Sequence, residues 1–65
     1  MDKVLTRNRI RIIRQEKRLR QLDLARLLDI YQSEVSEIER GERRPGVYLA
    51  KRIAKALGKR IDEVF

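Results

Sequence analysis

Apolar residues recur along this chain at intervals of three and four positions, which is the period of an α-helix. Ile10 and Ile13 share one face of a first helix that runs to about Lys17. Thr6 or Asn8 could cap its start. The same spacing predicts further helices over residues 21–28, 32–40 and 47–57, and a last turn over 61–65. With no alternating strand pattern, the expected fold is all-α, a compact bundle of four to five short helices.

The inward positions of these helices are expected to form one core. They are aliphatic: Leu24, Leu28, Val35, Ile38, Ile53 and Leu57. Residues 29–31 form a turn between the second and third helices, and Asp29 tolerates the left-handed conformation better than most residues do. Gly41 suits the position just after the third helix, and Pro45 and Gly46 separate that helix from the fourth. Residues 21–40 are therefore two short helices joined by a tight turn.

The segment 32–40 has two unlike sides when it is drawn as a helix. Val35 and Ile38 share one side and anchor it to the core. The opposite side carries short polar groups and one cation: Gln32, Ser33, Ser36, Glu37 and Arg40. A helix with such an outward side can lie in the major groove of DNA and offer donors and acceptors to base edges.

The joint spacing of these residues resembles the phage-repressor (Cro-like) family of helix-turn-helix proteins, whose fold is the lambda-repressor-like domain. The matching positions are Gln21, Leu24, Ala25, Leu28, Ile30, Ser33, Val35, Ser36, Ile38, Glu39 and Gly41, extended by Arg14, Pro45 and residues 53–58. The resemblance covers roughly residues 8–65. Three positions depart from it: the family usually has Gly at Asp29, and a Ser or Thr that caps a helix at Arg20 and Tyr31.

The resemblance implies roles for particular residues. Arg14 would pair with Glu39 and tie the first helix to the third, a structural role. Gln21, at the start of the second helix, would bind a DNA phosphate, and backbone N–H groups at a helix N-terminus favour an anion there. Glu34 would touch the rim of the base-reading surface.

Length and composition narrow the functional classes. Sixty-five residues make one domain, 1–65, with a thin core. The chain has no His and no Cys, and Ser33 and Ser36 have no base to activate them, so we expect neither an enzyme, a metal site nor a cofactor. No apolar run approaches the ~20 residues that span a bilayer, and no secretory leader is visible. We therefore expect a cytoplasmic protein without a membrane partner.

The charge is unevenly distributed. The net charge is +7, which suits a polyanionic partner, yet residues 21–42 carry two cations and six acids. The attraction must come from the flanking segments. The negative module keeps an alternative open, a helix-turn-helix scaffold that binds a protein, such as an antitoxin or anti-repressor partner. A second alternative is DNA binding by charge alone.

The leading expectation is sequence-specific binding of double-stranded DNA by a transcriptional regulator, with repression favoured. The base-reading candidates are Gln32, Ser33, Glu34, Ser36 and Glu37, and the phosphate candidates are Arg20, Gln21, Arg40, Arg43 and Arg44. One short helix reads only a few base pairs, so a homodimer on a two-fold symmetric site is expected. Its candidate contact is the apolar end of the chain, Ile61, Val64 and Phe65.

Overall fold

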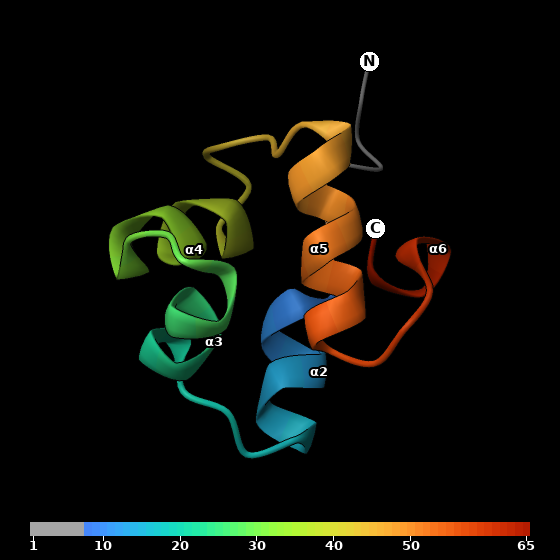
Figure 1. Ribbon diagram of the computed structural model, residues 1–65, viewed down its shortest axis with the longest axis horizontal. Coiled ribbons are helices and arrows are strands. Elements are labelled where there is room, and N and C mark those ends of the chain that lie inside the picture. Colours follow the sequence, from blue (N-terminus) through green and yellow to red (C-terminus); the bar gives the residue numbers. More distant parts are fainter. Residues whose placement is uncertain (1–7) are drawn as a thin grey trace.

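The computed structural model describes residues 8–65, and these residues form five helices and no strand. The helices are α2 (Ile10–Glu16), α3 (Gln21–Leu28), α4 (Gln32–Glu39), α5 (Val47–Ala56) and α6 (Ile61–Val64). Figure 1 shows α3 and α4 on one side of the bundle and α5 and α6 on the other. The expected all-α fold is confirmed, and the helices α3 to α6 each start at the predicted residue and end within one residue of the predicted end.

Asn8 joins the start of α2 to the end of α4. Its side-chain oxygen accepts a hydrogen bond from the Ile10 N–H at 3.1 Å, which satisfies a helix donor that has no partner within the helix. Its amide nitrogen donates to the Ile38 carbonyl at 2.8 Å. Arg9 occupies the N-cap position and makes no side-chain cap bond, so Asn8 bonds the helix from one position earlier. Thr6, the other predicted cap, lies outside the described residues.

Three helices begin with the same unusual cap. The backbone N–H groups of Arg20, Tyr31 and Arg60 donate to the carboxylates three residues later, Asp23 at 2.8 Å, Glu34 at 3.2 Å and Glu63 at 2.7 Å. This is the half of a capping box in which the third helical residue reaches back. It explains how α3 and α4 start without the usual Ser or Thr.

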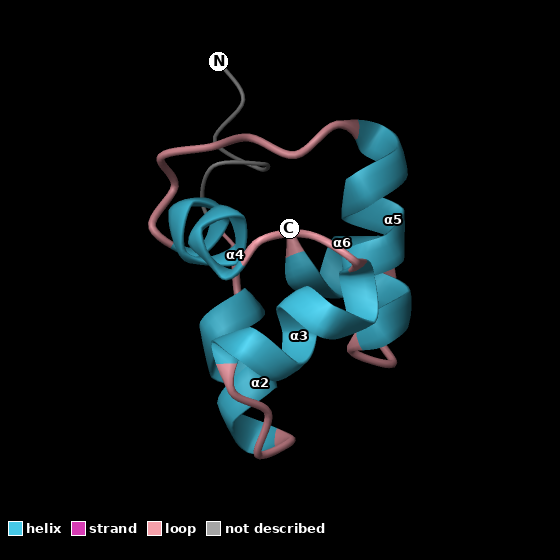
Figure 2. Cartoon of the chain, turned by 60° about the vertical axis from the view of Figure 1, so that its left-hand side comes forward, coloured by secondary structure: helices cyan, strands magenta, loops and turns pink. Residues whose placement is uncertain are grey.

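The turn between α3 and α4 is set by Asp29. Asp29 adopts the left-handed conformation, with φ at 57°, where the family usually has Gly. The Ile30 N–H donates to the Ala25 carbonyl at 3.0 Å, and the Ile30 side chain packs partly buried against the core. The two helices consequently lie close together, and a longer loop leads from α4 to α5 (Figure 2).

The core is continuous through all five helices. The six predicted core residues are each at most 2% exposed. The rest of the cluster is Ile10, Ile13, Ala25, Ala54 and Val64. The Arg9 N–H donates to the Val64 carbonyl at 2.8 Å, which ties α6 to the start of α2. None of the described helices has the length and apolar character to cross a membrane.

Candidate nucleic-acid interface

Helix α4 presents a polar face to solvent. Val35 and Ile38 are 2% and 1% exposed and fix the helix to the core. Opposite them, Gln32 and Ser33 are exposed, and the remaining base-reading candidates, Glu34, Ser36 and Glu37, are half-buried. The five predicted base-reading residues thus lie on one helix, with Glu34 on its flank, where its carboxylate accepts from the Tyr31 N–H.

A buried ion pair joins α2 to the last residue of α4. The guanidinium of Arg14 bonds Glu39 through Nε at 2.7 Å and Nη2 at 3.3 Å, and its Nη1 donates to the Leu19 carbonyl at 2.7 Å. The two side chains are 10% and 0% exposed. The structure therefore brings together the pair that the resemblance implied, and Arg11 lies 3.6 Å from the same carboxylate.

The environment of Glu39 favours its charged form. Burial opposes ionisation, but hydrogen bonds from Arg14 and Gln21, together with the charges of Arg14 and Arg11, outweigh it. The pKa of Glu39 therefore lies below its usual value of 4.5.

Gln21 connects this ion pair to the outward face. Its Nε2 donates to Glu39 at 3.0 Å, and its Oε1 accepts from Gln32 Nε2 at 3.5 Å. The residue opens α3 while its side chain lies beside the first residue of α4. Hydrogen bonds therefore connect the buried Glu39 to Gln32, a base-reading candidate, through Gln21, which was expected to bind phosphate.

Arginines expected at phosphate are ion-paired with carboxylates. Arg20 bonds Asp23 through Nε and Nη2, both at 3.1 Å. Arg40 bonds Glu42 in the same manner at 2.8 and 2.9 Å, and also bonds the Ser36 hydroxyl. Arg43 bonds Glu37 at 2.8 Å, and the fourth arginine, Arg44, has an exposed side chain.

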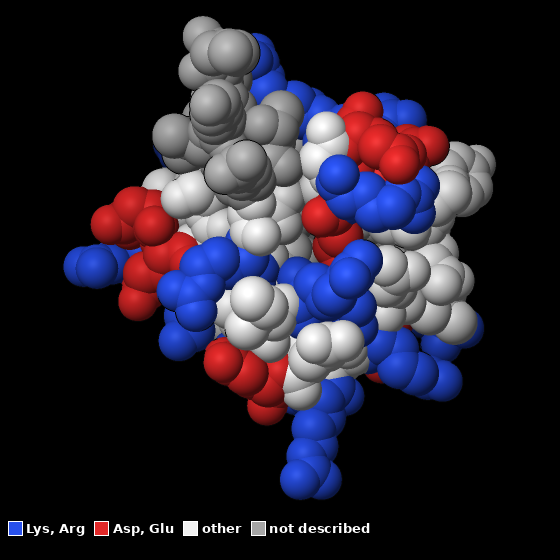
Figure 3. Space-filling model, turned by 180° about the vertical axis from the view of Figure 1, so that it is seen from behind, with Lys and Arg blue, Asp and Glu red and all other residues white. Residues whose placement is uncertain are grey.

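These pairs were missed by the sequence reasoning, which assigned acids and arginines separately. The Arg20–Asp23 pair has a helical spacing of three, so its signal was present. The Arg43–Glu37 pair had no such signal, because it forms only when the loop after α4 folds back. Figure 3 shows basic and acidic side chains as neighbours on the face it presents, rather than one uniformly basic surface.

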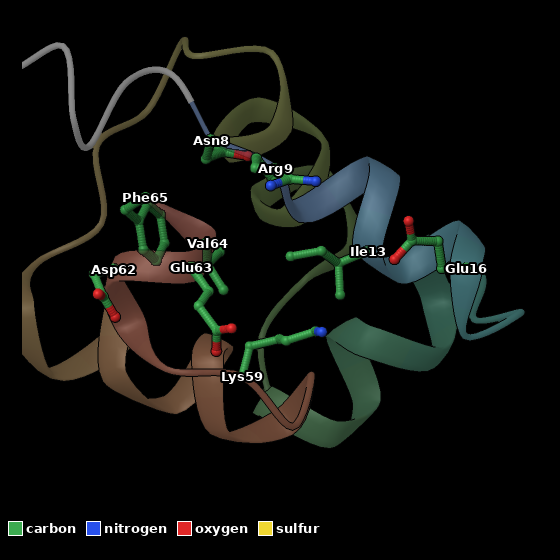
Figure 4. A pocket seen from close by; sticks show the side chains of 9 residues that line it. All are labelled: Asn8, Arg9, Ile13, Glu16, Lys59, Asp62, Glu63, Val64 and Phe65. Atoms are coloured by element: carbon green, nitrogen blue, oxygen red, sulfur yellow. The ribbon is translucent and has the colours of Figure 1, made fainter.

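The residues expected at a dimer contact differ in their surroundings. Val64 is 1% exposed and belongs to the core, so its side chain is not available on the surface. Ile61 is 37% exposed, and Phe65 packs half-buried against the core. Phe65 also lines a hollow of about 370 Å³ between α2 and α6, together with Arg9, Glu16 and Lys59 (Figure 4).

Exposed apolar side chains also occur at positions that were given no part in binding. Tyr31 is 78% exposed at the start of α4, and Leu27 and Tyr48 are 58% and 77% exposed. Arg52 lies over the Tyr48 ring at 5.9 Å, a cation–π contact. Within residues 8–65, no group of three or more acidic, His or Cys side chains is placed to hold a metal ion.

The chain is similar to known proteins in sequence and in structure. A family model described as helix-turn-helix matches residues 10–64. The restriction-modification controller protein C.AhdI from Aeromonas hydrophila is 35% identical, with a TM-score of 0.82, over 88% of this chain and 86% of that chain. The clp gene regulator ClgR from Corynebacterium glutamicum is 25% identical, with a TM-score of 0.81, over 91% of this chain and 62% of that chain. Among curated proteins, none matches this chain by sequence.

Proposed function

The chain belongs to the helix-turn-helix family of DNA-binding transcriptional regulators, and on this premise we propose that it reads a specific operator with α4 in the major groove. The observation that carries the proposal is the two-sided character of α4. Its apolar side is fixed in the core by Val35 and Ile38, while its outward side offers amide, hydroxyl and carboxylate groups. Such groups distinguish base pairs in the major groove.

The proposed contacts divide into two kinds. Gln32, Ser33, Glu34, Ser36 and Glu37 lie toward base edges, with Glu34 at the rim. Gln21 and the N-terminus of α3 meet one phosphate, because free N–H groups and the helix dipole favour an anion. Arg20, Arg40 and Arg44 add phosphate contacts once their present carboxylate partners, where they have them, are exchanged for DNA. Arg43 was also expected at phosphate, and its guanidinium bonds Glu37 on the outward side of α4.

The regulatory outcome is proposed from the relatives. C.AhdI is a restriction-modification controller protein and ClgR is a clp gene regulator. We propose that this chain represses transcription by occupying promoter DNA in the cytoplasm, at the nucleoid. A homodimer would place two α4 helices in successive major grooves, with half-sites ~34–36 Å apart.

Selection of bound duplexes from a random pool, followed by binding measurements over a range of salt concentrations, tests the proposal. Specific reading predicts an enriched pseudo-palindromic site that is bound at least ~10³-fold more tightly than random duplex. Affinity should fall as salt rises, by ~0.9 logarithmic units of affinity per logarithmic unit of salt for each phosphate contacted. Binding by charge alone would give no enriched site. A protein-binding scaffold would bind neither duplex.

The structure supplies an observation against binding by charge alone. Three arginines near the proposed interface already form ion pairs with carboxylates. They are Arg20, Arg40 and Arg43. Phosphates must therefore compete with internal partners, which weakens a purely electrostatic attraction. Specific contacts at base edges then have to supply a larger part of the affinity.

A further inference from the structure

We infer that Arg43 reads a guanine in the major groove and that Glu37 positions it for this contact, an inference that rests on the proposed function. The guanidinium of Arg43 lies on the outward side of α4, because its Nε donates to Glu37 Oε1 at 2.8 Å. Glu37 belongs to the middle of the face that enters the groove in the proposed function. A guanidinium held there lies among the base-reading candidates rather than at the edge of the interface.

The loop after α4 is folded so that Arg43 is fixed at both its backbone and its side chain. The N–H groups of Glu42 and Arg43 both donate to the Glu37 carbonyl, at 2.9 and 3.3 Å. The chain therefore turns back over the last turn of α4 directly after Gly41, whose φ is 76°. With its backbone and its guanidinium bonded to the same residue, Arg43 has less conformational freedom to lose when it binds.

The pairing leaves one edge of the guanidinium available. Among the described residues, the hydrogen bond recorded for the Arg43 side chain uses Nε alone. The terminal Nη1 and Nη2 groups form a second edge with two parallel N–H donors. These donors match the O6 and N7 acceptors of guanine, the commonest specific contact of arginine in DNA complexes.

Arg40 and Arg20 differ from Arg43 in this respect. Arg40 uses Nε and Nη2 for Glu42 and Nη1 for Ser36, so its whole fork is occupied. Arg20 uses Nε and Nη2 for Asp23. Of these three arginines, Arg43 is thus the one that keeps both Nη1 and Nη2 available while it is paired with a carboxylate.

The pair also accounts for a carboxylate in the centre of a DNA-binding face. An isolated Glu37 would be repelled by the phosphates on both sides of the groove. Paired with Arg43, the carboxylate and the guanidinium are neutral together, and the donor edge points away from the carboxylate. Glu37 is then a positioning residue, because its Oε1 accepts the Nε–H of Arg43.

The test compares the selected duplex with copies in which one guanine at a time is replaced by 7-deazaguanine, which lacks the N7 acceptor. For the wild-type protein, one replacement per half-site should weaken binding by about tenfold, within the range of a bidentate base contact. Arg43→Ala and Glu37→Ala should reduce that ratio to near one. Glu37→Gln should keep most of it, because the amide oxygen can still accept from Nε.

Arg20→Ala is the matched control, because it removes an ion-paired arginine from the proposed phosphate contacts. It should weaken binding to every duplex alike and leave the guanine ratio at its wild-type value. Without DNA, the Arg43 Nε–H resonance should shift in Glu37→Ala and stay unchanged in Arg20→Ala. Thermal midpoints near that of the wild type show that the variants remain folded.

Two results overturn the inference while leaving the proposed function intact. If Arg43→Ala keeps the wild-type ratio at every guanine, then Arg43 reads no guanine. If Glu37→Ala keeps a ratio that Arg43→Ala loses, then Glu37 does not position Arg43. A wild-type protein that selects no sequence at all overturns the proposed function and this inference together.

Discussion

Glu39 carries a negative charge on a side chain that is 0% exposed, and its main partner is Arg14. The stability of the fold therefore depends on this pair. Arg14→Ala would remove both guanidinium bonds to Glu39 and the bond to the Leu19 carbonyl. Gln21 and Arg11 would remain beside the carboxylate. A buried charge that loses its main partner is nevertheless costly, so we expect the free energy of unfolding to fall by about 3 kcal/mol. Urea denaturation measures this change. Arg11→Ala is the control, because that side chain is 57% exposed, and a comparable loss there would contradict the role given to Arg14.

The lowered pKa of Glu39 predicts how stability depends on pH. A carboxylate whose pKa is lower in the folded chain than in the unfolded chain stabilises the fold above the unfolded pKa. That contribution is lost as the pH falls through the folded pKa. The unfolding free energy should therefore decrease below about pH 4.5. The decrease should be shallower in Glu39→Gln, with a residual slope because the pKa values of Asp23, Glu42 and Glu63 are also lowered.

Residue roles followed from the sequence where partners are close in the chain or fixed by the family pattern. Arg14 and Glu39 were placed together by the resemblance, and the structure brings them into contact. Arg43 and Glu37 were assigned to phosphate and to a base edge, because nothing in a helical pattern indicates that residue 43 returns to residue 37. The return depends on backbone bonds made after Gly41, which side-chain periodicity does not encode.

At the scale of elements, one substitution should stabilise the start of α4. Tyr31 already has the extended backbone of an N-cap, with φ at −75° and ψ at 147°, but its side chain makes no cap bond. Tyr31→Ser would supply a hydroxyl to a free helix N–H, and the lost ring is 78% exposed. We expect the free energy of unfolding to rise by about 0.5–1 kcal/mol.

Chemical denaturation checks this prediction against a tyrosine of equal exposure. Tyr48 is 77% exposed and lies inside α5 rather than at its N-cap, so Tyr48→Ser should give no such gain. If Tyr31→Ser is no more stable than Tyr48→Ser, then a hydroxyl at this position adds nothing to the bond that the Glu34 N–H already donates to the carbonyl of residue 31, at 3.0 Å.

The helices themselves were largely predictable. The bounds of α3 agree with the prediction, and the turn at Asp29 has the expected left-handed conformation. The apolar period and the punctuating residues are local signals, which explains this agreement. The reversed caps were not anticipated, although Asp23, Glu34 and Glu63 are each the third residue of a helix. A search for Ser or Thr just before a helix overlooks an acid at its third residue.

At the scale of the whole molecule, the surface for self-association follows from burial. Val64 is part of the core, which leaves Ile61 as the exposed member of the predicted contact. If two chains associate through α6, Ile61→Ser should shift sedimentation toward the monomer and weaken binding to a full operator, with little change in stability. Ile12→Ser is the control, because Ile12 is 51% exposed on α2.

Phe65→Ser tests whether Phe65 contributes to the core as well as to the predicted dimer contact. Phe65 packs against the core, so its loss should lower the free energy of unfolding by about 2 kcal/mol whether or not the chain dimerises. A wild-type protein that remains monomeric at high concentration and binds a half-site as tightly as a full site would rule out the dimer.

The reversed caps of α3 and α4 separate two tasks that one side chain usually combines. In a helix that is capped by its first residue, that residue must stay Ser, Thr, Asp or Asn, whatever the helix binds. Here the acid at the third position holds the helix start, so the positions occupied by Arg20 and Tyr31 are released from that requirement. In the proposed complex, Arg20 lies at a phosphate and Tyr31 directly precedes the base-reading helix α4. The chain could therefore change the side chains at these two positions, and so adapt to a changed operator, while the fold beneath them stays as it is.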